Sequence, residues 1–411
     1  MRHFITLFAG LVIASALAGC APKKTSTNGA KPIVIWTQMD PEERARFAAN
    51  LDAFKAGHPG AQIQFVPYDT ENLHTQFQAA AAAGGGPQII FGPSDQVGPL
   101  SLTRLIKPLD AILPAGFFDR FVPQALDTLD GHLYAAPDQV GNHLTLCYNR
   151  KLVAKPPETT EEFLALAKKL TKPGAGNTSG VYGFAMNLTE PYWLAPFLAG
   201  FGGWVMDRSR RPTLDAPAMV EALSFLRDLK TGRNIMPRES DYQIAETLFK
   251  EGKAAMIING PWSWSGYRKA GIDLGVAPIF RLPNGRWASP MTASKGYSIN
   301  ARVTDAELPG LVELIDYLTS PAAELRSARA LGILPSHRQA YTDSLLADPI
   351  LAASRRAFDL GRRMPVVPEM RVIWDVMRTG MQEVMTGAKS PRQAALDMQV
   401  TALEQVAGMR R

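Results

Sequence analysis

The sequence predicts an α/β fold that contains a parallel sheet. Three apolar runs, at 32–36, 63–66 and 88–91, have the length and composition of short buried strands. Segments with helical periodicity separate them, at 41–57 and 73–83. Strand, helix, strand, helix, strand is the order that builds parallel strands. At 411 residues and 46% hydrophobic, the chain is long enough for two ordinary domains.

The first predicted helix has a well-marked start. Asp40 is a good N-cap, Pro41 suits the first helical position, and Glu43 stands where a capping box needs it. The apolar face of this helix consists of Phe47, Leu51 and Phe54.

The later elements follow from the same signals. An Asp-Gly pair predicts a hairpin over 129–133. Most of the chain beyond residue 308 has a helical pattern. Between them we predict strands at 144–148, 181–184, 254–258 and 297–300, and helices at 160–170, 219–229 and 242–249.

The N-terminus has the pattern of an export signal. A short, potentially basic start precedes the apolar stretch 4–18, which is too short for a comfortable membrane span. Leu17-Ala18-Gly19-Cys20 resembles a bacterial lipobox, which implies a signal peptide at 1–19, lipidation of Cys20 and a flexible tether over 20–30. An ordinary signal peptide with a chance cysteine is the alternative.

Composition excludes several classes of function. The formal charge is +6, but no basic run is interleaved with aromatics, so we expect no nucleic acid partner. Cys147 is the only other cysteine, and the six histidines show no ligand spacing. We therefore expect no disulfide once Cys20 is lipidated, no metal and no cofactor.

Two tryptophans follow a Gly-Pro pair in the segment 259–264. Gly260-Pro261 predicts an end of regular structure. Beside such a stop, Trp262 and Trp264 can form a flat apolar wall on which sugar rings stack, or both can belong to the core.

Carboxylates beside aromatics offer the polar half of such a site. Glu190 precedes Tyr192 and Trp193, and Asp95 follows a predicted strand at its carboxyl end, where ligands bind in open α/β sheets. Two carboxylates with aromatic walls suit a glycoside hydrolase and a non-catalytic sugar receptor equally, since both must bind hydroxyls and ring faces.

Taken in order, these residues resemble the maltose/maltodextrin-binding family of solute receptors that serve ABC importers. The match runs from about Lys31 to the C-terminus. Its strongest segments are 32–36, 86–91, 187–192, 241–246, 255–264 and 364–378.

This resemblance implies a two-lobed periplasmic-binding-protein fold of type II, in which each lobe is a mixed sheet flanked by helices and the ligand cleft lies between the lobes. The first lobe should comprise 31–141 plus 292–342, and the second 146–290 plus 348–411. The hinge should lie near 141–146, 290–292 and 342–348.

The resemblance also implies the ligand-binding residues. They are Asp40, Asp95, Asn142, Glu190, Tyr192, Trp262, Trp374 and Arg378. Asp40 can serve as N-cap and as ligand if its two oxygens are shared. Trp264 is expected to pack rather than to contact the ligand.

The chain departs from the family at several polar positions of the first lobe. Pro41 replaces a lysine, Gly92 a tryptophan, Gln96 an arginine and Asn142 a glutamate. Each lost partner of a buried hydroxyl typically costs about 1–3 kcal/mol, so these changes can move the ligand preference away from maltose.

The implied function is that of a monomeric lipoprotein of the periplasm or cell envelope, which binds maltose or maltodextrin and presents it to the membrane subunits of an ABC importer. One alternative keeps the fold but binds trehalose, another disaccharide or a glycerol-phosphate-like solute. The other is an exported glycoside hydrolase that uses Glu190 with Asp95 or Asp40.

Overall fold

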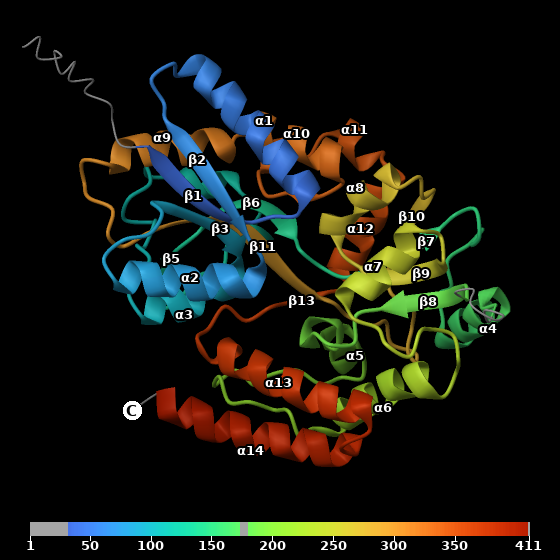
Figure 1. Cartoon of the computed structure of the whole chain (residues 1–411). Coiled ribbons are helices and arrows are strands. Elements are labelled where there is room, and N and C mark those ends of the chain that lie inside the picture. Colours follow the sequence, from blue (N-terminus) through green and yellow to red (C-terminus); the bar gives the residue numbers. More distant parts are fainter. Residues whose placement is uncertain (1–31, 173–179, 410–411) are drawn as a thin grey trace, which may run out of the picture. The chain divides into compact units, whose positions relative to one another are not determined.

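The computed structural model describes residues 32–172 and 180–409 (Figure 1). The predicted signal peptide, the lipidation site Cys20 and the tether lie outside the described residues, so they stay predictions. No helix in the described part of the chain is both long and apolar enough to span a membrane.

The first large sheet gathers strands from distant parts of the chain. β1 lies between β2 and β3 and is parallel to both, whereas β11 runs antiparallel to β3 and to β6. Its strands are β1 (Ile33–Gln38), β2 (Ile63–Tyr68), β3 (Ile89–Pro93), β6 (Ala136–Gly141), β11 (Met291–Ile299), β12 (Leu334–Pro335) and β13 (Arg362–Arg363). The three predicted strands and their parallel pairing are confirmed, and the complete sheet is mixed.

Helices cover both faces of this sheet. Figure 1 shows α1, α9 and α10 on one face and α2 and α3 on the other. Their bounds are α1 (Pro41–Gly57), α2 (Thr70–Ala82), α3 (Val97–Leu102), α9 (Leu308–Leu318) and α10 (Pro321–Leu331). The predicted hairpin is also present as β4 (Thr128–Leu129) and β5 (His132–Leu133), with both turn residues at positive φ as an Asp-Gly turn requires.

The start of α1 is as the sequence predicts. Asp40 Oδ1 accepts the backbone N–H of Glu43 at 2.8 Å, and Glu43 Oε2 accepts the N–H of Asp40 at 3.2 Å. Phe47, Leu51 and Phe54 are buried against the sheet. This helix is therefore fixed in place both by its cap and by its apolar face.

A buried ion pair ties α1 to β11. Lys295 Nζ donates to both carboxylate oxygens of Glu43, at 2.9 and 3.0 Å, and the two side chains are 2% and 5% exposed. Nearby, burial raises the pKa of Asp138 to about 7, although the Tyr297 hydroxyl donates to it at 3.2 Å. The interior of the first sheet is thus polar where α1 begins.

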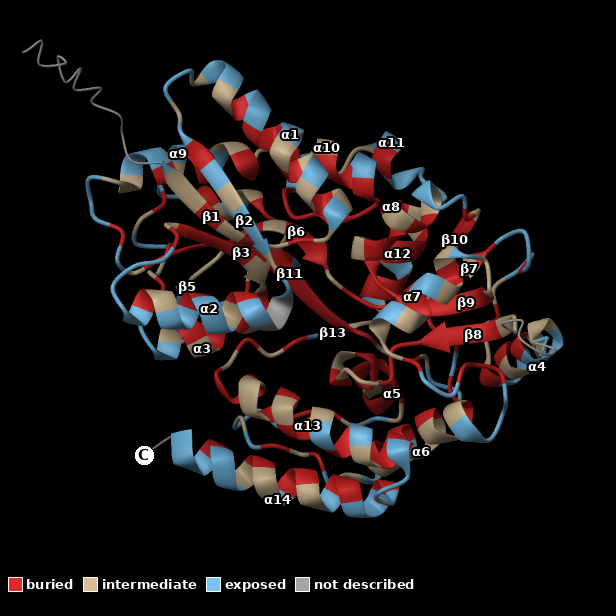
Figure 2. Cartoon of the chain, in the orientation of Figure 1, coloured by how far each residue is buried: buried red, intermediate tan, exposed pale blue. Residues whose placement is uncertain are grey.

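The second sheet has the order β10-β7-β9-β8. β7 is antiparallel to both β9 and β10, and β8 is parallel to β9. Every residue of β9 is buried, and the strand is red along its length in Figure 2. The strands are β7 (Thr145–Asn149), β8 (Tyr182–Met186), β9 (Ala254–Asn259) and β10 (Leu274–Ala277).

The remaining helices pack mainly around the second sheet. α13 and α14 form a hairpin that packs on α6, and Gly387 with φ 81° closes α13. The helices are α4 (Thr160–Leu170), α5 (Ala195–Gly200), α6 (Pro217–Thr231), α7 (Tyr242–Lys250), α8 (Pro261–Lys269), α11 (Asp343–Leu346), α12 (Pro349–Asp359), α13 (Glu369–Thr386) and α14 (Pro391–Met409).

The chain passes from the first sheet to the second between β6 and β7, and it returns between β10 and β11. Two of the predicted hinge regions, 141–146 and 290–292, lie at these connections. The exact lobe boundaries stay a prediction.

Candidate functional site

The carboxyl ends of β1, β2 and β3 meet at one edge of the first sheet, because the three strands are parallel. Gln38 and Tyr68, the last residues of β1 and β2, are register partners. Asp40 follows β1, and Asp95 lies in the short 3₁₀ helix after β3. This is the edge at which ligands of open α/β sheets bind.

Asp40 has a structural role and also faces a cavity. Its Oδ1 caps α1, which confirms the predicted N-cap, and the residue lines a hollow of about 500 Å³. Burial raises the pKa of Asp40 above its usual range, and repulsion from Glu43 adds to this effect. Its role as a sugar ligand stays a prediction.

Both sheets contribute to the walls of this cavity. The chain after β1 and β2 forms one wall, and α7 and α8 form the other. The lining residues include Asp40, Tyr68, Asp69, Tyr242, Glu246 and Trp262. Carboxylates and aromatic rings therefore surround one space from both sides.

Three of the predicted ligand residues form a row of aromatic rings. The ring of Tyr192 lies 6.2 Å from that of Trp374 and 6.4 Å from that of Trp262, measured between centroids. Trp193 packs edge-on against Trp262 at 6.4 Å and supports it from behind. The row runs from α13 through the segment after β8 to α8.

Four predicted ligand residues bond in pairs at the Trp374 end of the row. Trp374 Nε1 donates to Asp95 Oδ2 at 3.2 Å, which joins α13 to the end of β3. One turn further along α13, Arg378 donates to Glu190 at 3.0 Å and to Asp375 at 3.1 Å. The structure thus brings Asp95, Glu190, Trp374 and Arg378 into one cluster beside Tyr192.

Asn142 contacts the aromatic row through its main-chain oxygen. The Tyr192 hydroxyl donates to the main-chain oxygen of Asn142, and Met291 O lies 3.3 Å from the same hydroxyl. Asn142 has φ 24°, in the left-handed region that asparagine tolerates better than most residues. Tyr192 therefore contacts both segments that connect the two sheets.

The Gly-Pro pair ends one element, as predicted, and the next element begins at once. β9 ends at Asn259, and Pro261 occupies the first position of α8, where its missing N–H costs nothing. On a helix, residues two apart point in nearly opposite directions. Trp264 is fully buried and donates to Cys147 Sγ at 3.1 Å, whereas Trp262 is half-buried and lines the cavity. The wall therefore has one indole, and the packing role expected for Trp264 is confirmed.

The glycine before α8 explains how Trp262 is seated. A Cβ at residue 260 would lie 2.1 Å from the Trp262 ring, so the indole rests directly on the bare backbone of Gly260. Only glycine allows this approach without displacing the ring.

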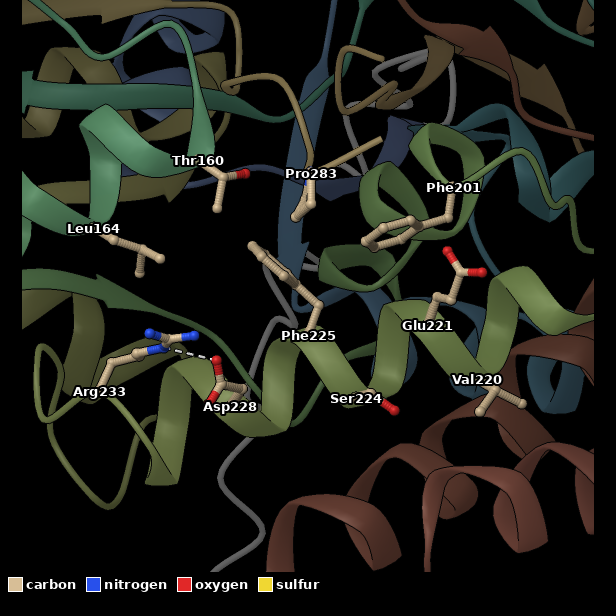
Figure 3. A pocket seen from close by; sticks show the side chains of 10 residues that line it. All are labelled: Thr160, Leu164, Phe201, Val220, Glu221, Ser224, Phe225, Asp228, Arg233 and Pro283. Carbon is tan, nitrogen blue, oxygen red and sulfur yellow. Dashed lines mark hydrogen bonds and ion pairs between the residues drawn. The ribbon is translucent and has the colours of Figure 1, made fainter. Parts of the chain in front are cut away.

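A second hollow of about 490 Å³ lies between α4 and α6, away from all predicted ligand residues (Figure 3). Its apolar walls include Leu164, Phe201 and Phe225. Three charged residues line it, Glu221, Asp228 and Arg233, and the last two bond to each other at 2.7 Å. Because no indole lines it, this hollow is the poorer place for a polyhydroxylated ligand.

Sequence patterns did not identify Tyr68 or the positions of Tyr242 and Glu246 in the cavity wall. Tyr242 was predicted only as the start of a helix. Its hydroxyl donates to Glu246 at 3.2 Å, and its ring packs on Trp193 at 5.8 Å. An aromatic residue at the last position of a strand, directly before a helix cap, was the signal that could have found Tyr68.

Within residues 32–172 and 180–409, no group of three or more His, Cys, Asp or Glu side chains could hold a metal ion. Cys147 is buried, and desolvation raises the pKa of its thiol to about 12. The cavity offers carboxylates that accept hydrogen bonds, the cationic side chains of Arg44 and Lys250 that donate them, and aromatic rings for stacking.

Comparison with known proteins places these features in context. A family model described as bacterial extracellular solute-binding protein matches residues 40–325. A maltotriose-binding protein of Pyrococcus abyssi is 27% identical over 381 residues, which cover 90% of this chain and 80% of the relative. A galactooligosaccharide-binding protein of Bacillus subtilis is 26% identical over 422 residues, which cover 96% of this chain and 95% of the relative.

The structural comparison agrees. The maltose/maltodextrin-binding domain of Bdellovibrio bacteriovorus, solved with bound maltotriose, superposes with a TM-score of 0.88 at 39% sequence identity. The match covers 92% of this chain and 100% of that domain. The predicted fold class, two lobes built on mixed sheets, is confirmed.

Proposed function

Because the chain belongs to the bacterial extracellular solute-binding protein family, we propose that it is the receptor of an ABC importer and binds maltotriose and related maltodextrins. The observation that carries this proposal is the aromatic row Trp374–Tyr192–Trp262 beside a cavity that Asp40 also lines.

This arrangement suits an oligosaccharide for two reasons. Sugar rings present apolar C–H faces, which stack on aromatic rings, and hydroxyls at their edges, which donate to carboxylates. In addition, one wall of the cavity lies at the ends of β1 and β2 in the first sheet, and the other is formed by α7 and α8, which pack beside the second sheet. A ligand that contacts both walls favours the closed arrangement of the lobes by its greater affinity for that arrangement.

The choice of sugar rests on the relatives. The Pyrococcus protein is a maltotriose-binding protein, and the Bdellovibrio domain was solved with maltotriose. The Bacillus relative is named for galactooligosaccharides, so a different oligosaccharide is the second candidate. Pro41, Gln96 and Asn142 differ from the residues of the maltose-binding family at these positions, so the test includes a galactooligosaccharide.

We also propose that the receptor works as a monomer on the outer side of a membrane, held there by lipid on Cys20. Anchoring raises its effective concentration near the importer's membrane subunits. In this role the receptor breaks no bond in the sugar.

The test uses the full chain with Cys20→Ser, which prevents lipidation, in a thermal-unfolding screen against maltose, maltotriose, trehalose, a galactooligosaccharide and glycerol 3-phosphate. A ligand that binds only the folded state adds about 2.7 kcal/mol at a hundredfold excess over its Kd. We expect the largest stabilisation from maltotriose. If another sugar stabilises the protein and maltotriose does not, that sugar is the ligand. Release of glucose or maltose from maltotriose would support the hydrolase instead.

A further inference from the structure

We infer that Tyr68 forms the aromatic face of the cavity opposite Trp262, and that one sugar ring of the ligand lies between these two side chains. The inference rests on the proposed function. It adds a binding residue that neither the sequence pattern nor the resemblance to the family identifies.

The backbone of Tyr68 is held on both sides. It is the last residue of β2 and pairs in register with Gln38 of β1. The next residue, Asp69, caps α2 by accepting the N–H of Asn72 at 3.0 Å. A strand end followed at once by a helix cap leaves the position of the Tyr68 Cα little freedom.

The ring of Tyr68 is held as well. It packs against the Trp36 ring with 4.9 Å between centroids and a tilt of 44° between the planes. Trp36 in turn packs on the apolar cluster beneath β3 and α3. Tyr68 nevertheless remains half-buried and lines the cavity. A tyrosine fixed in this way loses little conformational entropy when a ligand stacks on it.

The opposite wall is equally rigid. Trp262 rests on Gly260 and is supported by Trp193, and Tyr242 lies next to it on α7. The chain after β1 and β2 presents three carboxylates to the cavity, on Asp40, Glu42 and Asp69, and Tyr68 is the one aromatic residue of that wall among the described residues. The volume of about 500 Å³ is in the range of small-molecule sites.

The position of Tyr68 along the ligand follows from the aromatic row. Trp262 lines the cavity, whereas Trp374, at the other end of the row, does not. Tyr68 therefore acts at the Trp262 end of the ligand. A pyranose ring has two faces, and at this end both meet an aromatic surface.

The experiment measures maltotriose affinity by calorimetry for the full chain with Cys20→Ser and three variants. We expect Tyr68→Ala to weaken binding about 5- to 30-fold, because stacking and buried area are lost together. Tyr68→Phe keeps the ring and should stay within about threefold of the parent. Tyr68→Leu removes the ring but keeps an apolar contact with Trp36, so its affinity for maltotriose should fall by a similar factor. This variant tests the inference if Tyr68→Ala does not fold.

Tyr182→Ala is the matched control, because Tyr182 is a half-buried strand tyrosine that does not line the cavity. Its affinity should equal that of the parent. If the parent binds maltotriose and both Tyr68→Ala and Tyr68→Leu bind it equally well, the inference fails and the proposed function stands. If the parent binds none of the sugars in the screen, the proposed function fails and the inference fails with it.

Discussion

The indole of Trp374 donates its N–H to the carboxylate of Asp95 across a distance of 3.2 Å, and so connects α13 with the carboxyl end of β3. Both residues were predicted to bind the ligand. In this structure Asp95 Oδ2 accepts the indole N–H. A carboxylate has several acceptor positions, so Asp95 can accept a sugar hydroxyl while it keeps the bond to the indole. The predicted binding role and the connection between the two sheets therefore meet at this carboxylate.

Trp374→Phe tests that connection, because it keeps an aromatic face and removes the N–H. A hydrogen bond to a charged group such as this carboxylate contributes about 1.5–3 kcal/mol net. We expect the variant to unfold at a lower urea concentration than the parent, and the ligand-free protein should be more expanded in small-angle X-ray scattering. An unchanged scattering profile in the absence of sugar would show that the bond does not hold the two sheets together.

Trp262→Ala should remove most of the affinity for sugar while lowering the free energy of unfolding little, because Trp262 is half-buried and lines the cavity. Calorimetry with maltotriose and urea unfolding of the same preparation give the two quantities. Normal binding by this variant would show that the aromatic row is not the platform for the ligand.

Trp264→Ala should have the opposite profile. Trp264 is fully buried in a cluster with Cys147 and Phe249, and truncating a buried aromatic residue costs about 3–5 kcal/mol. We expect a large fall in the urea midpoint, with near-parental sugar affinity in whatever fraction remains folded. A stable Trp264→Ala protein that binds no sugar would contradict the separation of the two indoles into core and site.

Lys295→Met should destabilise the protein by about 3–5 kcal/mol, because it leaves the buried carboxylate of Glu43 without its charged partner. Urea unfolding measures the loss. The double variant Lys295→Met with Glu43→Gln removes both charges and should recover part of it. If the single and double variants are equally stable, the ion pair is not what holds α1 against β11.

His143 predicts a loss of stability in acid. It is fully buried, its Nε2 lies 3.0 Å from Ser354 O, and burial lowers its pKa to about 4. The unfolded chain takes up the proton first, at its ordinary pKa of 6.5. The stability that the neutral ring contributes is therefore complete above pH 6.5 and is lost as the pH falls towards 4, by roughly 3 kcal/mol in total.

Burial of Asp138, whose pKa is raised to about 7, acts in the opposite direction over the same range, so the wild-type curve alone does not isolate the histidine. The measurement is the difference in unfolding free energy between the parent and His143→Gln from pH 7 to pH 4. That difference should shrink as the pH falls. A constant difference would mean that His143 does not titrate on unfolding in this range.

Local signals predicted the fold well. The capping box at Asp40 and Glu43 and the Asp-Gly turn at Asp130 act within a few residues, so their outcome can be predicted from short stretches of sequence. Gly260-Pro261 shows the limit. The pair predicts the end of β9, but it does not predict that α8 begins at Pro261 and buries Trp264.

The resemblance to a known family led to Trp262, Trp374 and Arg378, whose roles as ligand residues stay predictions. Tyr68 and Lys295 were missed because their importance depends on partners far away in sequence: Trp262 across the cavity for the first, Glu43 across 252 residues for the second. The hydrophobic pattern of the sequence does not predict which distant residues will lie side by side.

The bond from the Tyr192 hydroxyl to the main-chain oxygen of Asn142 has an evolutionary consequence. Every amino acid has that oxygen, so the contact places no demand on the side chain at position 142. Its left-handed φ alone limits the choice, to residues such as asparagine, aspartate and glycine. A substitution among these residues can therefore change the side chain that position 142 offers to a ligand, while the bond between Tyr192 and the backbone of residue 142 is kept.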